Sequence, residues 1–242
     1  MCGSLIVYQT EVKGEHHELG TSGFLYRANK LMYDHKTQSL WSTLQGIPVV
    51  GPLVGQGIEL PQRHVVTTTW GQWRRQHPET LVLDIETGVD RDEDEGVAYR
   101  DYFATDELKY NVPRLDGRLP NKAPVLTLRF GDFQLAISTK ILMKNRVYHE
   151  QVGTRSLVVL TDDAGASRVY DSGEHRFTQF NTSDNPELLG AVLTEQTKQG
   201  IVEWTISEAC LKRENEELAR LPAHRAFWFG WYAQFPNTRL VQ

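Results

Sequence analysis

The stretch VLTLRFGDFQLAI, residues 125–137, decides the fold class. Two runs rich in β-branched, aromatic and leucine residues flank a Gly-Asp dipeptide, a pattern that is typical of a β-hairpin. Similar short runs recur along the 242 residues between glycines and prolines, whereas helical periodicity is brief. The sequence therefore predicts a mainly β protein, a β-rich α+β fold with few helices.

The hairpin lies in the second of two segments that match one another in order. A match of this kind predicts two tandem copies of one β unit, each with a short tryptophan-containing helix near its end. The matched pairs are Gly3 with Gly165, Val7 with Val169, Tyr8 with Tyr170, Thr21-Ser22 with Thr182-Ser183, Trp41 with Trp204, Trp70 with Trp228, Trp73 with Trp231, Gln76 with Gln234, Pro78 with Pro236, and Thr80 with Thr238.

The matches divide the chain into a first unit at 1–83, a linker at 84–123 that is acidic and then proline-rich, and a second unit at 124–242. Residues 124–164 of the second unit precede Gly165, whereas the corresponding Gly3 lies at the start of the sequence. A unit without these strands would expose unpaired backbone and apolar surface. We therefore expect the first unit to be N-terminally incomplete, by about 40 residues.

The period of the apolar residues changes near the end of the first unit. Thr69 is a suitable N-cap for a short helix over 70–77, which Pro78 ends. Trp70 and Trp73 are three residues apart and share a helix face. We expect both indoles to pack inward as core anchors, and a strand to follow at residues 80–83.

Composition excludes several classes of protein. The net charge is −5. The stretch from Asp84 to Glu107 contains ten acidic residues and only two arginines, which is typical of a solvated loop. Asp90, Asp92 and Asp94 alternate like calcium ligands, but Glu95 stands where the turn glycine of a calcium loop belongs. No basic face argues for nucleic-acid binding, and no apolar run is long enough to span a bilayer.

Glycines distinguish the first unit from the second. The first unit has GTSG at residues 20–23 and a glycine series through residues 46–57, where the second unit has charged or polar residues. Because glycine permits a close approach of ligand to backbone, we expect any ligand cleft on the first unit. No phosphate-loop pattern is present, and no cofactor is indicated. The candidate cleft residues are Ser22, Gly23, Tyr33, Asp34 and Gly51.

Histidines and cysteines give weaker signals. His16 and His17 are adjacent, so in an extended chain their imidazoles point apart, which favours a solvated turn over a shared metal site. Cys2 and Cys210 are too few for a disulfide framework. Cys2 is either a small buried apolar residue or a thiolate that binds a metal or reacts with a partner outside the chain.

Several motifs together resemble the bacterial and archaeal domain-of-unknown-function family 3179. They are GTSGFL at 20–25, LMYDHKTQSLW at 31–41, GPL at 51–53, HPETLVL at 77–83, FWFGW at 227–231 and PNT at 236–238. Members of this family open the region with Cys-Pro-x-Cys-Gly-Ser, of which Met1-Cys2-Gly3-Ser4 retains the end. The resemblance thus implies a cysteine three residues upstream of Cys2 and frequent export of relatives, but it implies no reaction.

Two functions remain open from the sequence. The first is a ligand- or partner-binding module with its site on the first unit, because no catalytic set of residues can be assembled. The alternative is a metal- or thiol-dependent protein, a redox protein or metalloenzyme, in which Cys2 and the upstream cysteine form a Cys-x-x-Cys pair. Neither reading identifies the small-molecule or protein partner.

Overall fold

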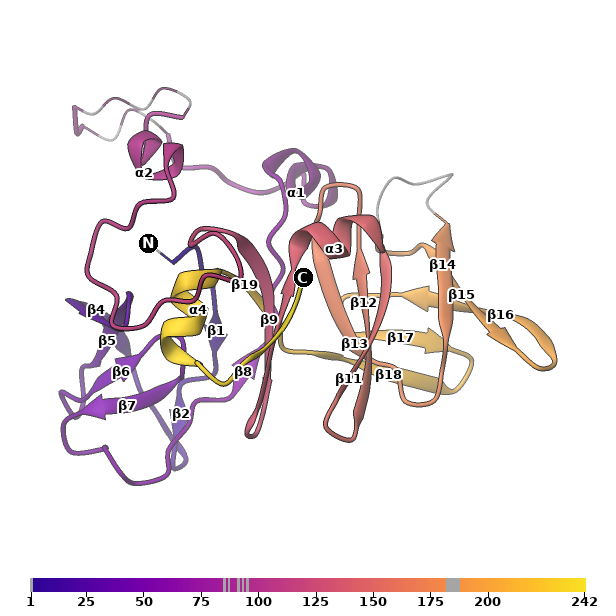
Figure 1. Ribbon diagram of the computed structural model, residues 1–242, viewed down its shortest axis with the longest axis horizontal. Coiled ribbons are helices and arrows are strands. Elements are labelled where there is room, and N and C mark those ends of the chain that lie inside the picture. Colours follow the sequence, from indigo (N-terminus) through magenta and orange to yellow (C-terminus); the bar gives the residue numbers. More distant parts are fainter. Residues whose placement is uncertain are drawn as a thin grey trace.

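A computed structural model describes residues 2–84, 86, 88–90, 92, 94, 96–181 and 188–242. In this part of the chain short strands predominate and the helices are few and short, so the predicted mainly β fold is confirmed. Thr182 and Ser183, which the sequence matches with Thr21 and Ser22, lie outside the described residues. The indigo and purple first half and the orange second half occupy opposite sides of Figure 1.

The predicted hairpin at 125–137 is confirmed. Strands β9 (Pro124–Phe130) and β10 (Phe133–Ser138) pair antiparallel around a turn in which Gly131 has a φ of 55°. Strands β19 (His224–Phe227) and β20 (Arg239–Val241) flank this hairpin and complete a four-stranded sheet in the order β19-β9-β10-β20. Helix α4 (Trp228–Gln234) connects the two outer strands and buries Trp228 and Trp231 against the sheet.

The second half also contains an eight-stranded sheet, in the order β11-β12-β13-β18-β17-β16-β15-β14. Its first and last strands approach each other, and the imidazole of His149 on β11 lies within hydrogen-bond distance of the backbone of Phe177 on β14. The sheet is therefore nearly closed. The strands are β11 (Val147–Val152), β12 (Arg155–Thr161), β13 (Ser167–Asp171), β14 (Phe177–Asn181), β15 (Val192–Thr197), β16 (Gly200–Ile206), β17 (Cys210–Arg213) and β18 (Glu216–Leu221).

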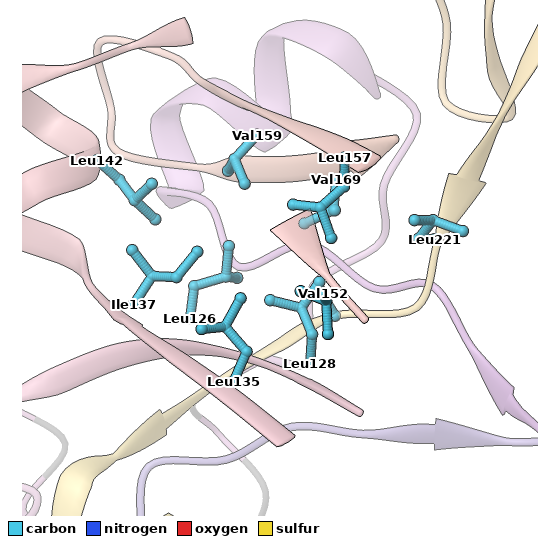
Figure 2. Packing of buried hydrophobic residues seen from close by; sticks show 11 residues of the cluster. Leu126, Leu128, Leu135, Ile137, Leu142, Val152, Leu157, Val159, Val169 and Leu221 are labelled. Carbon is cyan, nitrogen blue, oxygen red and sulfur yellow. The ribbon is translucent and has the colours of Figure 1, made fainter. Parts of the chain in front are cut away.

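The main core of the second half lies between these two sheets (Figure 2). Leu126 and Ile137 come from the four-stranded sheet, and Leu157 and Val159 from the eight-stranded one. Leu142, on helix α3 (Thr139–Lys144), closes one end of the cluster. All five side chains are buried. Most members of this cluster come from one continuous segment, residues 124–161.

The first half consists of shorter strands around a smaller core. Strands β4, β5, β6 and β7 form one antiparallel sheet, β1 pairs with β8, and β2 pairs with β3. Trp41, fully buried, packs there with Leu53 and Leu60. The strands are β1 (Val7–Tyr8), β2 (Glu11–Val12), β3 (Glu15–His16), β4 (Leu19–Tyr26), β5 (Asn29–Asp34), β6 (Leu40–Ser42), β7 (Ile47–Val50) and β8 (Gln62–Arg63).

Helix α1 (Trp70–Gln76) forms where predicted, with the Thr69 hydroxyl accepting a hydrogen bond from the backbone N–H of Gln72. The prediction that its tryptophans are core anchors is wrong, because Trp70 is 52% exposed and Trp73 is 38% exposed. The strand expected at 80–83 does not form either. Both errors have one physical reason: in the described residues no sheet covers this helix as the four-stranded sheet covers α4.

The segment between the halves has little regular structure. Within residues 84–123 the described part contains helix α2 (Arg100–Ala104), which buries none of its residues. The Asp106 carboxylate accepts hydrogen bonds from the backbone N–H groups of Asn121 and Lys122. These bonds hold the middle of the segment against its C-terminal end. Of the acidic run, Asp90, Asp92 and Asp94 are exposed, as a solvated loop requires, and Glu93 and Glu95 lie outside the described residues.

None of the described helices has the length and apolar character needed to cross a membrane.

Candidate functional site

A groove of about 330 Å³ lies where the two halves meet. The first half contributes residues 59–62, which lead into β8, and the second half contributes the end of the β9–β10 hairpin, Arg155 and Pro222. Small-molecule sites favour such junctions and have volumes of roughly 300–1,000 Å³. The groove is therefore large enough for a small ligand that contacts both halves.

Arg129 forms the fixed wall of this groove. Its guanidinium donates a hydrogen bond to the backbone oxygen of Gln45 over 2.8 Å and another to Glu59 Oε1 over 2.5 Å. The same group lies over the ring of Phe235, 5.4 Å from its centroid. These contacts hold Arg129 in one orientation and link β9 to the first half.

Arg155, which also lines the groove, is held more loosely than Arg129. Its guanidinium carbon lies 5.0 Å from the ring centroid of Phe130, and its Nε atom is 3.7 Å from Asp171 Oδ2, which is longer than a hydrogen bond. The side chain is 45% exposed. Arg155 therefore has donors available to a ligand, and Phe130 supplies an apolar surface next to them.

A neutral histidine contacts Gln62, one of the residues that line the groove. The amide Nε2 of Gln62 lies 2.8 Å from Nδ1 of the buried His224. Burial, together with the smaller effect of the nearby positive charge of Arg129, lowers the pKa of His224 to about 3. The imidazole is therefore neutral at pH 7, so its Nδ1 accepts the hydrogen bond from Gln62 and ties β8 to β19.

Sequence reasoning missed this groove. Its polar residues come from β8, β9 and β12, and none of them is unusual within its own segment. An alternation pattern identifies Arg129 and Arg155 as strand residues but not as neighbours of residues 59–62. A signal could come only from the spatial pairing of the halves, which a single sequence does not contain.

The structure places the predicted Asp34 at the centre of a buried hydrogen-bond network. Its Oδ2 atom lies 2.8 Å from Nδ1 of His17 and accepts a 2.6 Å hydrogen bond from the Thr37 hydroxyl, while Oδ1 accepts from the Lys36 backbone N–H. Burial raises the pKa of Asp34, but these hydrogen bonds outweigh it and the pKa is lowered. The carboxylate is thus ionised and fully enclosed, which suits ordering of the turn rather than direct contact with a ligand.

The expectation that His16 and His17 share a solvated turn is wrong for His17. His16 is exposed, but His17 is buried against Asp34. The two imidazoles do point apart, as expected of adjacent residues in an extended chain. The inward one reaches Asp34 because β4 and β5 pair in a register that sets Leu19 opposite Asp34.

The other predicted cleft residues lie in two places. Gly51, with a φ of 99°, packs against the turn that follows Asp34, since a Cβ atom there would lie 2.8 Å from the Cα atom of Ser39. Ser22 and Gly23 lie in an irregular part of β4, where the Ser22 hydroxyl donates to the backbone oxygen of Leu31. Neither the groove at the junction of the halves nor the one lined by residues 47–48, 55 and 57–59 includes any of these residues or Asp34.

Tyr33, the remaining candidate, lies on the surface of the same sheet. It is half-buried, and its ring centroid is 4.5 Å from that of His35. A Cβ atom at Gly20 would lie 2.6 Å from Tyr33 Cε1, so the glycine lets the ring lie flat on β4. This pair forms a small aromatic surface on the first half.

Cys2 is enclosed by the C-terminal helix. The residue is buried, its Sγ atom lies 2.9 Å from the Ser4 hydroxyl, and its side chain fits against Gly230, where a Cβ atom would lie 2.3 Å from the Cys2 Cβ. Cys210 is distant in sequence and half-buried beside Ser207. The described residues contain no group of three His, Cys, Asp or Glu side chains that would hold a metal ion.

The fold is that of a mainly β protein with a nearly closed eight-stranded sheet. The chain belongs to the family described as "Protein of unknown function (DUF3179)", whose model matches residues 1–238. The resemblance inferred from its motifs is thereby confirmed over nearly the whole chain. No match was found among curated proteins or among solved structures.

Proposed function

We propose that this protein is a non-catalytic binding module that holds a small anionic ligand in the groove between its halves. The observation that carries the proposal is the pair of guanidinium groups, Arg129 and Arg155, that line one groove together with residues 59–62. Guanidinium groups bind carboxylates and phosphates with parallel hydrogen bonds, so their presence favours a ligand of this charge.

The two arginines have different roles in this proposal. Glu59 already occupies Arg129, so Arg129 shapes the groove and supplies positive potential. Arg155 exchanges its long contact with Asp171 for a direct hydrogen bond to the ligand. The ring of Phe130, under Arg155, then covers an apolar part of the ligand, which favours a carboxylic acid with a hydrocarbon portion over free phosphate.

The test is a thermal-shift and calorimetric titration of the purified chain with acetate, succinate, benzoate and inorganic phosphate at constant ionic strength. We expect an organic carboxylate to raise the melting temperature and to release or absorb measurable heat. Arg155→Gln should weaken binding about tenfold or more, because a hydrogen bond to a charged group contributes about 1.5–3 kcal/mol. Arg176→Gln, at an exposed arginine elsewhere, is the matched control.

Two outcomes would contradict the proposal: no anion binds, or Arg155→Gln and Arg176→Gln behave alike. A third variant, Tyr33→Ala, tests the alternative location on the first half. If Tyr33→Ala abolishes binding and Arg155→Gln does not, the ligand binds beside Tyr33, Asp34 and Gly51 rather than in the groove.

A further inference from the structure

The groove at the junction of the halves contains a carboxylate as well as its two arginines. Glu59 lines it together with Arg129 and Arg155. The side chain of Glu59 is 55% exposed, whereas that of its ion-pair partner Arg129 is 18% exposed. A ligand in the groove therefore reaches the carboxylate of this pair more readily than the guanidinium, whose positive charge Glu59 offsets.

Glu59 keeps an acceptor for a ligand. Its Oε1 atom accepts the hydrogen bond from Arg129, and within the described part of the chain its Oε2 atom has no hydrogen-bond donor. Gln62 adds a second acceptor, because its amide Nε2 faces His224 and its Oε1 accepts no hydrogen bond from the described residues. A carboxylate oxygen accepts N–H donors, and it binds charged donors most strongly. This part of the groove therefore suits an ammonium group.

Arg155 has the opposite chemistry. A guanidinium group has several N–H donors and no acceptor. The carboxylate of Asp171 is 3.7 Å from the Nε atom of Arg155, and among the described residues no carboxylate lies within hydrogen-bond distance of this guanidinium. The Arg155 side chain is half-exposed. This part of the groove therefore suits a carboxylate.

The two charged parts lie on different faces of β9, because successive side chains of a strand point to opposite faces. Arg129, which holds Glu59, lies over Phe235, a member of the cluster that contains the tryptophans of α4. Phe130 packs instead against the main core and has the guanidinium of Arg155 over its ring. A ligand that contacts both Glu59 and Arg155 must therefore carry its two charges several bonds apart.

The edge of β9 is open between these faces. Strand β19 pairs with residues 124–127 of β9, so in the described residues the stretch 128–130 has no strand partner on that side. Pro61, Phe130 and Pro222 add apolar surface to the groove, and the prolines have no N–H group that would compete for a carboxylate. A hydrocarbon chain between the two charges can lie against these side chains.

We propose that the groove binds a linear aminocarboxylic acid, with its ammonium group on Glu59 and its carboxylate on Arg155. This inference rests on the proposed function, because the carboxylate is the anionic group assigned there to Arg155. It adds the role of Glu59, which selects for an ammonium group at the other end of the ligand. A dicarboxylate would place a second negative charge against Glu59, and an α-amino acid is too short to reach both residues.

The test is isothermal titration calorimetry of the 242-residue chain at neutral pH and constant ionic strength, with ε-aminocaproate, caproate, adipate and glycine. We expect ε-aminocaproate to bind about fivefold or more tightly than caproate, since the added ammonium gains a partly exposed ion pair. Adipate should bind more weakly than caproate, and glycine should give no measurable heat. Equal binding of ε-aminocaproate and caproate, or tighter binding of adipate, would overturn the inference.

Glu59→Gln supplies a second measurement, because it keeps the size of the side chain and removes its charge. The order of the ligands should reverse in this variant, with adipate binding more tightly than ε-aminocaproate, since Arg129 is then no longer paired with a carboxylate. Damage to the fold would weaken all ligands alike and would not reverse their order. Glu203→Gln, at an exposed glutamate of β16, is the matched control and should leave the order unchanged. An unchanged order in Glu59→Gln would contradict the inference.

Arg155→Gln separates this inference from the proposed function. It should weaken ε-aminocaproate and caproate together, by about tenfold or more, because both place their carboxylate on Arg155. If caproate binds through Arg155 but the ammonium group gives no advantage, the proposed function stands and the role of Glu59 is wrong. If none of these carboxylates binds, both are wrong.

Discussion

Gln62 and His224 meet at the junction of the halves, with the amide Nε2 atom 2.8 Å from the imidazole Nδ1 atom. The contact joins residues 162 positions apart and requires a neutral imidazole, because a protonated Nδ1 would face an N–H donor. Nearby, Arg220 donates to the backbone oxygen of Val65, a second bond across the same junction. Protonation of one buried side chain therefore affects how the two halves are held together.

As the pH falls, the free energy of unfolding should begin to decrease at a higher pH than protonation of the carboxylates alone would produce. The pKa of His224 is about 3 in the folded chain and about 6.5 when unfolded, so between these values the unfolded state binds more protons. Its contribution to the free energy of unfolding is complete above pH 6.5 and falls by about 1.4 kcal/mol per pH unit as the pH drops toward 3.

Urea unfolding at pH 7.5, 6.5, 5.5 and 4.5 checks this slope. His224→Gln keeps a hydrogen-bonding group but no titrating one, so its slope should be smaller by about 1.4 kcal/mol per pH unit. Part of the slope should remain, because burial also lowers the pKa of His149. Parallel slopes for the wild type and the variant would show that His224 does not titrate as described.

Removal of the Asp34 carboxylate should destabilise the first half. Asp34→Ala leaves the imidazole of His17, the hydroxyl of Thr37 and the N–H of Lys36 without their acceptor. The side chains of Asp34 and His17 are buried, so water does not replace the lost hydrogen bond between them. We expect a loss of about 3 kcal/mol in the free energy of unfolding. Asp132→Ala, at an exposed turn, should change it by less than about 0.5 kcal/mol, and equal losses would contradict the network's importance.

The matching helices should respond differently to the same substitution. Trp231→Ala removes a buried indole and its hydrogen bond to Thr238, and should cost about 3–5 kcal/mol. Trp73→Ala, at the corresponding but exposed position of α1, should cost about 1 kcal/mol or less in the 242-residue chain. Chemical denaturation of the two variants measures both values, and similar costs would mean that α1 is covered in solution.

The His149 imidazole should hold the nearly closed sheet together. Its Nε2 atom is 3.1 Å from the backbone nitrogen of Phe177 and 3.0 Å from its oxygen, and it serves one of them at a time. His149→Ala should therefore speed hydrogen exchange of the Phe177 amide about tenfold or more. Exchange along β15 and β16, away from this contact, is the internal control and should not change.

The parts of the fold that could be predicted are those that local sequence patterns determine. The hairpin around Gly131 and the helix after Thr69 depend on neighbours in sequence, so their residues identify them. Burial of Trp70 could not be predicted, because it depends on which distant strands cover the helix. Trp228, which the predicted repeat matches with Trp70, is buried in a cluster that includes Val125 and Ala136 of the β9–β10 hairpin.

The sites were less predictable for the same reason. Asp34 was selected for its turn, but its pairing with His17 follows from strand register, which a one-residue slip would abolish. The groove depends on three segments, around Gln62, Arg129 and Arg155, that meet only when the halves pack. Whether those halves are copies of one unit stays a prediction, for which the paired helices α1 and α4 supply supporting geometry.

The enclosure of Cys2 by the C-terminal helix has a consequence for folding. The backbone oxygen of Cys2 accepts a hydrogen bond from the N–H of Phe227, and Gln234 of α4 donates to the backbone oxygens of Tyr26 and Arg27. Figure 1 accordingly draws the yellow α4 beside the indigo start of the chain. Contacts between such distant residues form late, because a long loop must close first. During synthesis Cys2 therefore stays uncovered until residues 227–234 have left the ribosome.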